Sequence, residues 1–475
     1  MPTTFFDVTD LRVFVDRGQR LTGIQRVTVM LIEYTARTLG DGAVRLSFFD
    51  RKSGAYLSIP YTAPADGGPL TAEALGAMFY RGTLKTGVRP SLERYARKPV
   101  KRAVHTALRD INAALGNRKH FERRHITIEA WKASRGGAPA ATATGEARYV
   151  EPTDFFASAQ PGDRVILADA GWSVPVAPLK RAQGAGVTCH YLIHDLIQVL
   201  APEYIGGQKQ PVKFHDWLRS TVDFVDSYLA NSEATARDLR VFLDTYGGSQ
   251  RVEVVPLAQA GLPLPPRAAA PDGDLAGVDG AAYARLIEST PVSDRIRVLL
   301  KRPYVLCVGT MEARKNMWGL VQAWDRLRHR DDIELPRLVF AGNPGWLNFD
   351  YERTMEATGN LYGWVEPVFS PSDEELEFLY RNCLFTAMPS FFEGWGLPVG
   401  ESLSYGKTAV VSDTSSLPEV GGDMVAYFDP HSIASITATV YRMLAEEGYR
   451  EGLEARIAQT RLRSWEDVAQ DLLAA

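Results

Sequence analysis

The 475-residue sequence has few cysteines and no long apolar run. Its three cysteines, Cys189, Cys307 and Cys383, lie in or beside apolar, strand-like segments and are too far apart to form a metal-binding motif. We interpret them as reduced core thiols. No stretch of about 18 apolar residues is present, and the N-terminal residues MPTTFFDVTD lack the basic and then apolar pattern of a signal peptide. We therefore expect a cytoplasmic protein that does not span a membrane.

An excess of one charge is also lacking, because the formal net charge is only −4 at pH 7. This balance gives no general reason to expect nucleic-acid binding. Residues 81–125 are an exception, since they contain thirteen Lys or Arg against three Asp or Glu, a local net charge of +10. Apolar residues recur there at helical spacing, at Val100, Val104, Leu108, Ile111 and Leu115.

A basic amphipathic helix of this kind is typical of contact with an anionic membrane surface or with another polyanion. We therefore expect residues 81–125 to bind the inner face of the cell membrane. The same pattern also fits a helix that packs on its own domain and keeps its charges in water, so the sequence leaves both interpretations open.

Two motifs that would indicate other chemistry are missing as well. No G-x-G-x-x-G follows a predicted strand, which argues against a dehydrogenase that binds a dinucleotide. No acidic cluster suited to a divalent metal lies near the cationic loop described below, so we expect neither a metal ion nor a cofactor.

The most informative stretch is residues 387–430. A short apolar run at residues 384–388 reads as a buried parallel strand, and a loop with two glycines follows it. Pro398 suits the first turn of a helix and Gly406 suits the position just after the helix ends. Residues 407–411 read as the next strand. This strand–loop–helix–strand unit predicts an α/β fold with polar residues at the carboxyl edge of a parallel sheet, where such sheets bind ligands.

Two carboxylates flank the start of this predicted helix, Glu393 on the loop and Glu401 inside the helix. Free backbone N–H groups and the positive end of the helix dipole lie between them and favour a phosphate. A carboxylate on each side of a phosphate suggests a nucleotide-sugar, with the hexose at one end and the ribose at the other. The alternative is that Glu393 is an ordinary loop charge and Glu401 a solvated helix residue.

Cationic and polar residues follow other predicted strands. Arg314 and Lys315 lie at a strand-to-helix turn after residues 304–308, where adjacent cations would neutralise a diphosphate. His194 and Asp195 follow the strand at residues 187–193. Near the N-terminus we expect a strand at residues 11–16, then the turn with Gly23, and a helix over residues 27–39.

The segment FEGWGLPVGESLSYGKTAVVSD resembles the signature of the retaining glycosyltransferases of family 4, with the E-x7-E pair at Glu393 and Glu401. The segments TGIQRV, HD at residues 194–195 and GTMEARKN are also similar to loops of that family. The resemblance implies the GT-B fold, an α/β architecture of two Rossmann-like domains that face each other across a cleft.

This resemblance sets the expected domain organisation. An N-terminal acceptor-side domain covers residues 1–262, with a basic helical insert at about 51–160 that the resemblance does not cover. A linker follows at 263–302, and the nucleotide-sugar domain covers 303–455. The C-terminal helix, 456–475, is expected to pack back on the first domain through Trp465.

The resemblance also assigns roles to residues. Glu393 would hold the hexose hydroxyls of the donor, Glu401 its ribose, and Arg314 and Lys315 its diphosphate. The expected catalytic residues are Glu393, Lys315, Arg314 and His194, and the acceptor side contains Asp195 and Gln25. The expected donor-binding residues are Glu401, Gly23, Gly309, Thr310, Asn343, Val365, Phe392, Gly394, Trp395, Gly396 and Leu397.

The activity implied is the retaining transfer of a sugar, mannose or a related hexose or deoxyhexose, from a nucleoside-diphosphate donor, with a GDP-sugar favoured. The acceptor would be a saccharide or a lipid-linked saccharide in O-antigen or exopolysaccharide synthesis. Front-face displacement is the implied mechanism, and a short-lived covalent intermediate stays open. The alternatives are another enzyme of the same scaffold, such as an epimerase or a phosphorylase, and a non-catalytic assembly protein of a polysaccharide export complex.

Overall fold

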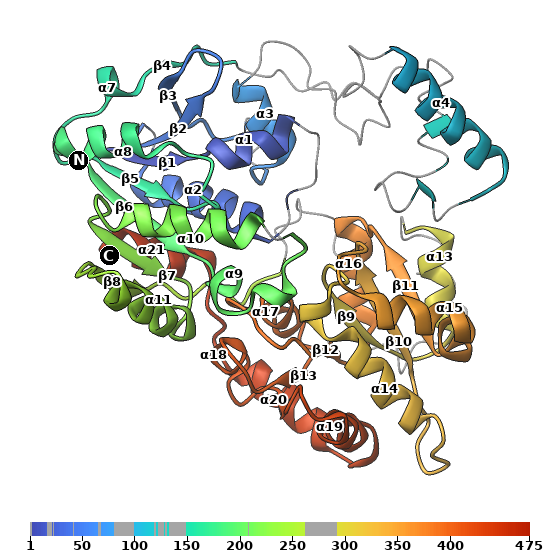
Figure 1. Cartoon of the computed structure of the whole chain (residues 1–475). Helices are drawn as coiled ribbons and strands as arrows, with labels where there is room; N and C mark the ends of the chain where they lie inside the picture. Colours follow the sequence, from blue (N-terminus) through green and yellow to red (C-terminus); the bar gives the residue numbers. More distant parts are fainter. Residues whose placement is uncertain are drawn as a thin grey trace. The chain divides into compact units, whose positions relative to one another are not determined.

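The structure is a computed structural model, and it describes residues 2–16, 21, 23–40, 42–64, 68–79, 99–117, 120–121, 128, 131–132, 149–207, 209–261 and 292–475. The chain forms two compact units, Met1–Val187 and Thr188–Ala475. Both contain parallel strands connected by helices (Figure 1). The expected α/β class is therefore confirmed, while the expected domain boundaries, with most of the 263–302 linker outside the described residues, stay a prediction.

The first unit contains a sheet with strand order β4-β3-β2-β1-β5. Strand β1 pairs in parallel with both β2 and β5, whereas β2–β3 and β3–β4 are antiparallel pairs. The strands are β1 (Thr4–Asp7), β2 (Val44–Asp50), β3 (Ala55–Pro60), β4 (Thr153–Asp154) and β5 (Arg164–Leu167). The chain thus leaves β1 toward β2 and later returns on the other side of β1 with β5.

The expected strand at residues 11–16 is wrong, because this segment lies in helix α1 (Thr9–Asp16). The alternation of Leu11, Val13 and Val15 suggested a strand, but Leu11 and Val15 are one helical turn apart and are both buried. The first strand is instead β1, whose four residues TFFD are all buried. Asp7 ends this strand and accepts a hydrogen bond from the backbone N–H of Thr9, at the start of α1.

The remaining helices of the first unit include α2, which begins three residues earlier than expected. These helices are α2 (Ile24–Leu39), α3 (Ala72–Phe79), α4 (Pro99–Ala114), α7 (Phe155–Ser158) and α8 (Val176–Gly184). The range expected to be a helical insert, about 51–160, therefore contains two sheet strands, β3 and β4, in addition to the helices α3, α4 and α7. Much of the basic segment 81–125 lies outside the described residues, and α4 is the part of it that the structure describes best.

The second unit begins with three parallel neighbours in the order β6-β7-β8. A six-stranded, fully parallel sheet follows, with strand order β11-β10-β9-β12-β13-β14. The strands are β6 (Thr188–Ile193), β7 (Ser227–Ala230), β8 (Arg251–Val254), β9 (Tyr304–Val308), β10 (Arg337–Gly342), β11 (Val365–Phe369), β12 (Thr386–Met388), β13 (Ala409–Ser412) and β14 (Ala426–Phe428).

Helices cover both faces of the six-stranded sheet. Residues of α14, α15 and α19 pack with the sheet in one hydrophobic cluster, in which Trp324 is fully buried. A second cluster on the other face contains residues of α13 and α16. The helices of the second unit are α9 (Ile197–Leu200), α10 (Lys209–Thr221), α11 (Glu233–Thr245), α13 (Asp294–Arg297), α14 (Met317–Leu327), α15 (Phe349–Gly363), α16 (Asp373–Asn382), α17 (Leu397–Ser404), α18 (Leu417–Gly421), α19 (Ile433–Ala445), α20 (Tyr449–Gln459) and α21 (Trp465–Ala474).

The last helix, α21, is anchored within the second unit. Ser464 and Asp467 form a capping box at its start, and Trp465 is buried. Just before it, Arg463 donates to the backbone oxygen of Pro256, and its own oxygen accepts from the N–H of Gln259. These contacts hold the C-terminal residues beside the segment that follows β8.

All three cysteines are buried and unpaired, as expected. Burial raises the pKa of each of these thiols to about 12, so none of them is ionised near neutral pH. Among the residues that the structure describes, no helix is both long and apolar enough to cross a lipid bilayer.

Candidate functional site

The candidate site lies where the strand order of the six-stranded sheet reverses. The chain runs outward from β9 to β10 and β11, and then returns to the other side of β9 with β12. Open α/β sheets bind ligands at such a switch point, outside the carboxyl ends of the strands. Here the segment after β9 contains Arg314 and Lys315, and the segment after β12 contains Glu393.

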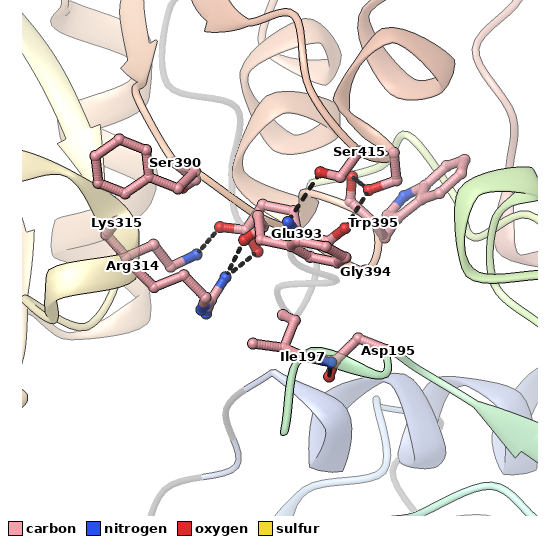
Figure 2. A network of polar contacts seen from close by, with 12 residues as sticks. Asp195, Ile197, Arg314, Lys315, Ser390, Glu393, Gly394, Trp395 and Ser415 are labelled. Carbon is pink, nitrogen blue, oxygen red and sulfur yellow. Dashed lines mark hydrogen bonds and ion pairs between the residues drawn. The ribbon is translucent and has the colours of Figure 1, made fainter. Parts of the chain in front are cut away.

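The structure brings these three side chains together. Lys315 Nζ lies 2.5 Å from Glu393 Oε1, and Arg314 Nη1 lies 2.9 Å from Glu393 Oε2 (Figure 2). Arg314 also donates to the backbone oxygen of Phe392 at 2.5 Å and to Glu312 Oε1 at 2.7 Å. Both cations and the carboxylate are largely buried, so water screens the interaction weakly.

This charge cluster shifts the pKa values of its acidic members. Burial alone would raise the pKa of Glu393, but Arg314 and Lys315 outweigh burial and lower it to about 2. Burial also opposes the charge of Arg314, yet Glu393 and Glu312 raise its pKa above the ordinary value. Burial raises the pKa of Glu312 and of Asp195, although Arg314 counteracts it at both. Glu393 is therefore ionised at neutral pH, where it binds both Arg314 and Lys315.

Backbone conformation positions the loop from Phe392 to Gly396. The N–H of Glu393 donates to Ser415 Oγ at 2.9 Å (Figure 2). Ser416 Oγ donates to the backbone oxygens of Glu393 and Trp395. Gly396 precedes α17 with φ of 108°, a conformation that favours glycine, and Pro398 lies in the first turn. The loop is thus held by the turn just before α18 (Leu417–Gly421).

Glu401 lies inside α17 and is buried. Its Oε2 accepts a hydrogen bond from the hydroxyl of Tyr380 at 2.7 Å, and the Tyr380 ring stacks on Tyr405. The segment with Glu401 follows β12, and the segment with Lys315 follows the adjacent strand β9, so both follow the carboxyl ends of neighbouring strands. The solvated-residue alternative does not hold for Glu401, because its side chain is removed from water.

Gly394 allows the loop to lie directly against the segment after β6. A Cβ atom on Gly394 would lie 1.9 Å from the backbone oxygen of His194, so any other residue would push the two segments apart. Thr235 Oγ1, in the first turn of α11, donates to the backbone oxygens of both His194 and Gly394. Next to His194, Asp195 Oδ1 accepts from the N–H of Ile197 at 3.0 Å (Figure 2).

The other predicted donor-binding residues of this unit do not all lie at the same edge. Gly309 follows β9, and Gly342 is the last residue of β10. The two are in such close contact that a Cβ on Gly342 would lie 2.0 Å from the Gly309 oxygen. Thr310 and Asn343 follow in these two loops, and the N–H of Met311 donates to the Asn343 oxygen. Val365 is different, because it starts β11 at the opposite end of the strand and its side chain is fully buried.

Gly23 and Gln25 belong to the first unit. Gly23 precedes α2 with φ of 52° and has no side chain to cap the helix. A Cβ there would meet no atom within 4 Å, so backbone conformation and not crowding favours glycine. Gln25 lies in the first turn of α2 and is largely buried.

Sequence reasoning missed several residues that build the site. Asn316 adopts a left-handed conformation with φ of 50°, caps α14 by accepting from the N–H of Gly319, and donates to the Pro430 oxygen. An Asn before an apolar helical run is a recognisable N-cap signal. Nothing in the spacing of the sequence pointed to Tyr380 or Ser416, because their partners Glu401 and Glu393 are 21 and 23 residues away. Glu312 was missed because Arg314 was interpreted only as a phosphate-binding residue.

Another missed residue is Glu419. Its carboxylate accepts hydrogen bonds from the backbone N–H groups of Glu233 and Ala234 at 2.7 and 2.8 Å, where α11 begins. A carboxylate at a helix N-terminus satisfies otherwise unpaired N–H groups and interacts favourably with the helix dipole.

Comparison with known proteins finds a family match within the second half of the chain. Residues 292–460 match the protein-family model described as "Glycosyl transferases group 1". The predicted resemblance to glycosyltransferases is therefore confirmed for this part of the chain, which contains the Arg314, Lys315 and Glu393 cluster.

The chain is also similar to proteins of surface polysaccharide synthesis. O-antigen chain mannosyltransferase B of Escherichia coli is 36% identical over 181 residues, which are 38% of this chain and 47% of that protein. The serotype-specific mannosyltransferase WbdA of Escherichia coli is 27% identical over 283 residues, 58% of this chain and 32% of that protein. The chain thus spans less than half the length of the curated relatives it matches here.

The fold agrees with that of a solved glycosyltransferase over the full length. Sucrose-phosphate synthase from Thermosynechococcus elongatus superposes with a TM-score of 0.54 at 13% sequence identity, covering 100% of this chain and 98% of that one. This likeness confirms the GT-B fold class expected from the sequence.

Proposed function

We propose that the protein is a retaining glycosyltransferase that moves mannose, or a related hexose or deoxyhexose, from a nucleoside-diphosphate donor to a saccharide hydroxyl. The acceptor is a saccharide or lipid-linked saccharide of a surface polysaccharide, and a GDP-sugar is the favoured donor. One observation carries the proposal: Lys315 and Arg314 both bind the Glu393 carboxylate at the switch point of a sheet that belongs to a group 1 glycosyltransferase domain. The two mannosyltransferases to which the chain is similar support the choice of sugar.

The chemistry follows from the charges at this edge. When the glycosidic bond to the diphosphate breaks, negative charge develops on the leaving phosphate. Two cations and the N-terminus of α17 can stabilise this charge, and removing one such group typically raises the barrier by about 3 kcal/mol. In this proposal Glu393 binds the donor hexose and Glu401 the ribose. The acceptor proton passes to the leaving phosphate in a front-face displacement, so the reaction requires no metal ion and no cofactor.

We also propose that α4 binds anionic lipids at the inner face of the cell membrane. Its apolar residues are exposed on one side of the helix, with Val100 at 75% and Ile111 at 56%. The opposite side contains Arg109 and Ala113, which pack near Trp131, and Arg109 lies over the Trp131 ring. The exposed apolar face favours the membrane interpretation over a helix whose apolar side packs on its own domain.

A thermal-shift panel with GDP, UDP, ADP and dTDP tests the donor. The matching nucleotide should raise Tm in proportion to its concentration, because a ligand that binds only the folded state stabilises it by mass action. Lys315→Ala should abolish the shift, since it removes one of the two cations that would neutralise the diphosphate. Lys407→Ala is the control, because it removes the same charge outside the cluster. A shift that survives in Lys315→Ala would contradict the assigned role.

Incubation with GDP-mannose tests the reaction. Transfer to an α-linked mannan oligosaccharide, with an α-linkage in the NMR spectrum of the product, is the expected result. Conversion of the donor without any acceptor would indicate an epimerase. Nucleotide binding without any turnover, over a panel of saccharide acceptors, would favour the non-catalytic assembly protein instead.

A further inference from the structure

The first unit has its own switch point, between β1 and β5. From β1 the chain moves to β2 on one side, and β5 later pairs with β1 on the other side. Three polar residues belong to the segments that follow: Asp10 in the first turn of α1, Asp169 after β5 and Gln25 in the first turn of α2. The sheet geometry that positions Lys315 and Glu393 in the second unit is thus repeated here with acidic and amide side chains.

Asp169 is an unusual carboxylate because half of it has no partner. The side chain is 2% exposed, and Oδ1 lies 2.8 Å from the backbone N–H of Ala170, which donates to it. Within the part of the chain that the structure describes, Oδ2 is buried and has no group at hydrogen-bonding distance, although the Gln25 side chain and the Leu11 backbone interact with the carboxylate and lower its pKa. A buried acceptor without a partner is costly, and native proteins retain few of them unless another group completes the site.

Asp163, at the other end of the same strand, shows what a structural carboxylate looks like in this unit. It is 4% exposed, and both of its oxygens are satisfied. Oδ1 accepts from the N–H of Thr3 at 2.7 Å, and Oδ2 accepts from the N–H of Gln160 at 2.8 Å. The two aspartates flank β5, and only the one at the ligand-binding edge leaves an oxygen unpaired.

The neighbours of Asp169 indicate the kind of ligand. Asp10 lies close enough for its charge to raise the pKa of Asp169 together with burial, and Asp10 Oδ2 is also buried without a partner. The Gln25 side chain approaches Asp169 from α2. Two acceptor oxygens beside an amide suit a neutral ligand with several hydroxyl groups, whereas the two carboxylates would repel a phosphate.

We propose that Asp169, together with Gln25 and Asp10, binds hydroxyl groups of the acceptor saccharide. Asp169 Oδ2 accepts a hydrogen bond from one hydroxyl, and the Gln25 amide contacts a neighbouring hydroxyl. No bond is made or broken at this site, so its residues position the acceptor and do not carry the chemistry. The inference rests on the proposed sugar transfer for the identity of the ligand.

The test compares Asp169→Asn with Asp163→Asn in the full-length protein. Ligand-observed NMR measures the Kd of methyl α-mannoside and of an α-linked mannobiose, with GDP present and absent. Asp169→Asn should weaken saccharide binding by at least about 10-fold, because a hydrogen bond to a charged group is lost. Gln25→Met, which keeps the side-chain length, should weaken it too, and Asp163→Asn should leave it unchanged.

Thermal unfolding at pH 8 separates a binding role from a structural one. Asp169→Asn should raise Tm, because it removes a buried charge that has an unpaired oxygen. Asp163→Asn should lower Tm, because its amide would face a backbone N–H donor. Equal saccharide affinity of Asp169→Asn and the unaltered protein would overturn the proposal. So would undetectable saccharide binding by the unaltered protein, or Ca²⁺ binding that Asp169→Asn abolishes.

These outcomes are distinguishable from failure of the proposed function. If none of the four nucleotides binds and no sugar is transferred, the function is wrong, while saccharide binding by the first unit still tests Asp169. If sugar is transferred and Asp169→Asn has the acceptor KM of the unaltered protein, the function stands and this inference is wrong.

Discussion

Glu393 acts as an internal anion for Arg314 and Lys315 in the absence of a donor. Its pKa of about 2 lies below the ordinary value of 4.5, so the ionised form stabilises the folded state. This contribution is fully present above pH 4.5 and is lost as the pH falls toward 2. Under the proposed function, a donor diphosphate would need the same two cations, and Glu393 would compete with the phosphate for them.

Glu393→Gln should separate these two effects. The amide removes the negative charge that competes for Arg314 and Lys315, so free GDP should bind several-fold more tightly. Transfer should nevertheless fall by about 100-fold in kcat/KM, because losing one group that stabilises the transition state typically costs 2–4 kcal/mol. Calorimetry with GDP and a transfer assay with GDP-mannose measure the two quantities.

Glu377→Gln is the matched control, because Glu377 forms an exposed ion pair with Arg381 on α16. Exposed pairs contribute little, so both GDP affinity and transfer should stay unchanged. Weaker GDP binding by Glu393→Gln would contradict the idea that Glu393 and the diphosphate share the same cations.

At the scale of single residues, the sequence predicted which charged side chains lie close together better than it predicted the residues that hold them in place. Glu393 and Lys315 are 78 residues apart, and their proximity followed from strand ends that meet at one edge of a parallel sheet. The serines that hold the Glu393 loop could not be found in this way, because a Ser hydroxyl can bond many backbone groups and has no characteristic spacing. The same limitation hid Tyr380 as the partner of Glu401.

At the scale of elements, buried parallel strands were the easiest to predict. The apolar runs that became β9, β10 and β12 have no other good interpretation, because they are short and bounded by Gly or Pro. Residues 11–16 were predicted wrongly, because three alternating apolar residues are compatible both with a strand and with one and a half turns of a helix. Val365 was expected to bind the donor through its backbone, and this stays a prediction, although Val365 begins β11 and does not lie at the carboxyl end of that strand.

Helix α4 gives the prediction that belongs to this scale. Ile111→Glu should reduce sedimentation with phosphatidylglycerol vesicles by 10-fold or more, because burying a large apolar side chain contributes about 2 kcal/mol. Ala103→Glu is the control, since Ala103 is exposed on α4 away from the apolar stripe and the substitution changes the charge equally. Binding should weaken with added salt, as expected for a segment of local charge +10. Equal sedimentation of both variants would contradict insertion of the apolar face.

At the scale of the molecule, each unit concentrates its polar residues at a switch point, but the second unit pairs its carboxylates there with cations. The second unit places Arg314 and Lys315 beside Glu393 after β9 and β12, and Arg314 also binds Glu312. The first unit places carboxylates after β1 and β5, and no cation among the described residues is bonded to Asp169. Such a division suits a reaction between an anionic donor and a neutral, hydroxyl-bearing acceptor, and it could not be read from the net charge of the whole chain.

The carboxylates of the first unit make its stability depend on pH. Burial raises the pKa of Asp7 and of Asp169 to about 7, and the nearby charge of Asp10 adds to this at both. A raised carboxyl pKa means that the folded state binds the proton more tightly than the unfolded state. The resulting stabilisation is fully present below pH 3.8 and is lost as the pH rises through 7, up to about 4 kcal/mol for each group.

The first unit should therefore resist unfolding better at pH 5.5 than at pH 8. Hydrogen exchange measured by mass spectrometry, corrected for intrinsic rates, should show greater protection of the β1 and β5 peptides at pH 5.5. The double variant Asp7→Asn and Asp169→Asn removes both titrating groups and should make this protection nearly independent of pH. Protection that increases from pH 5.5 to pH 8 in the unaltered protein would contradict the raised pKa values, because it would require carboxylates that are more stable ionised than protonated within the fold.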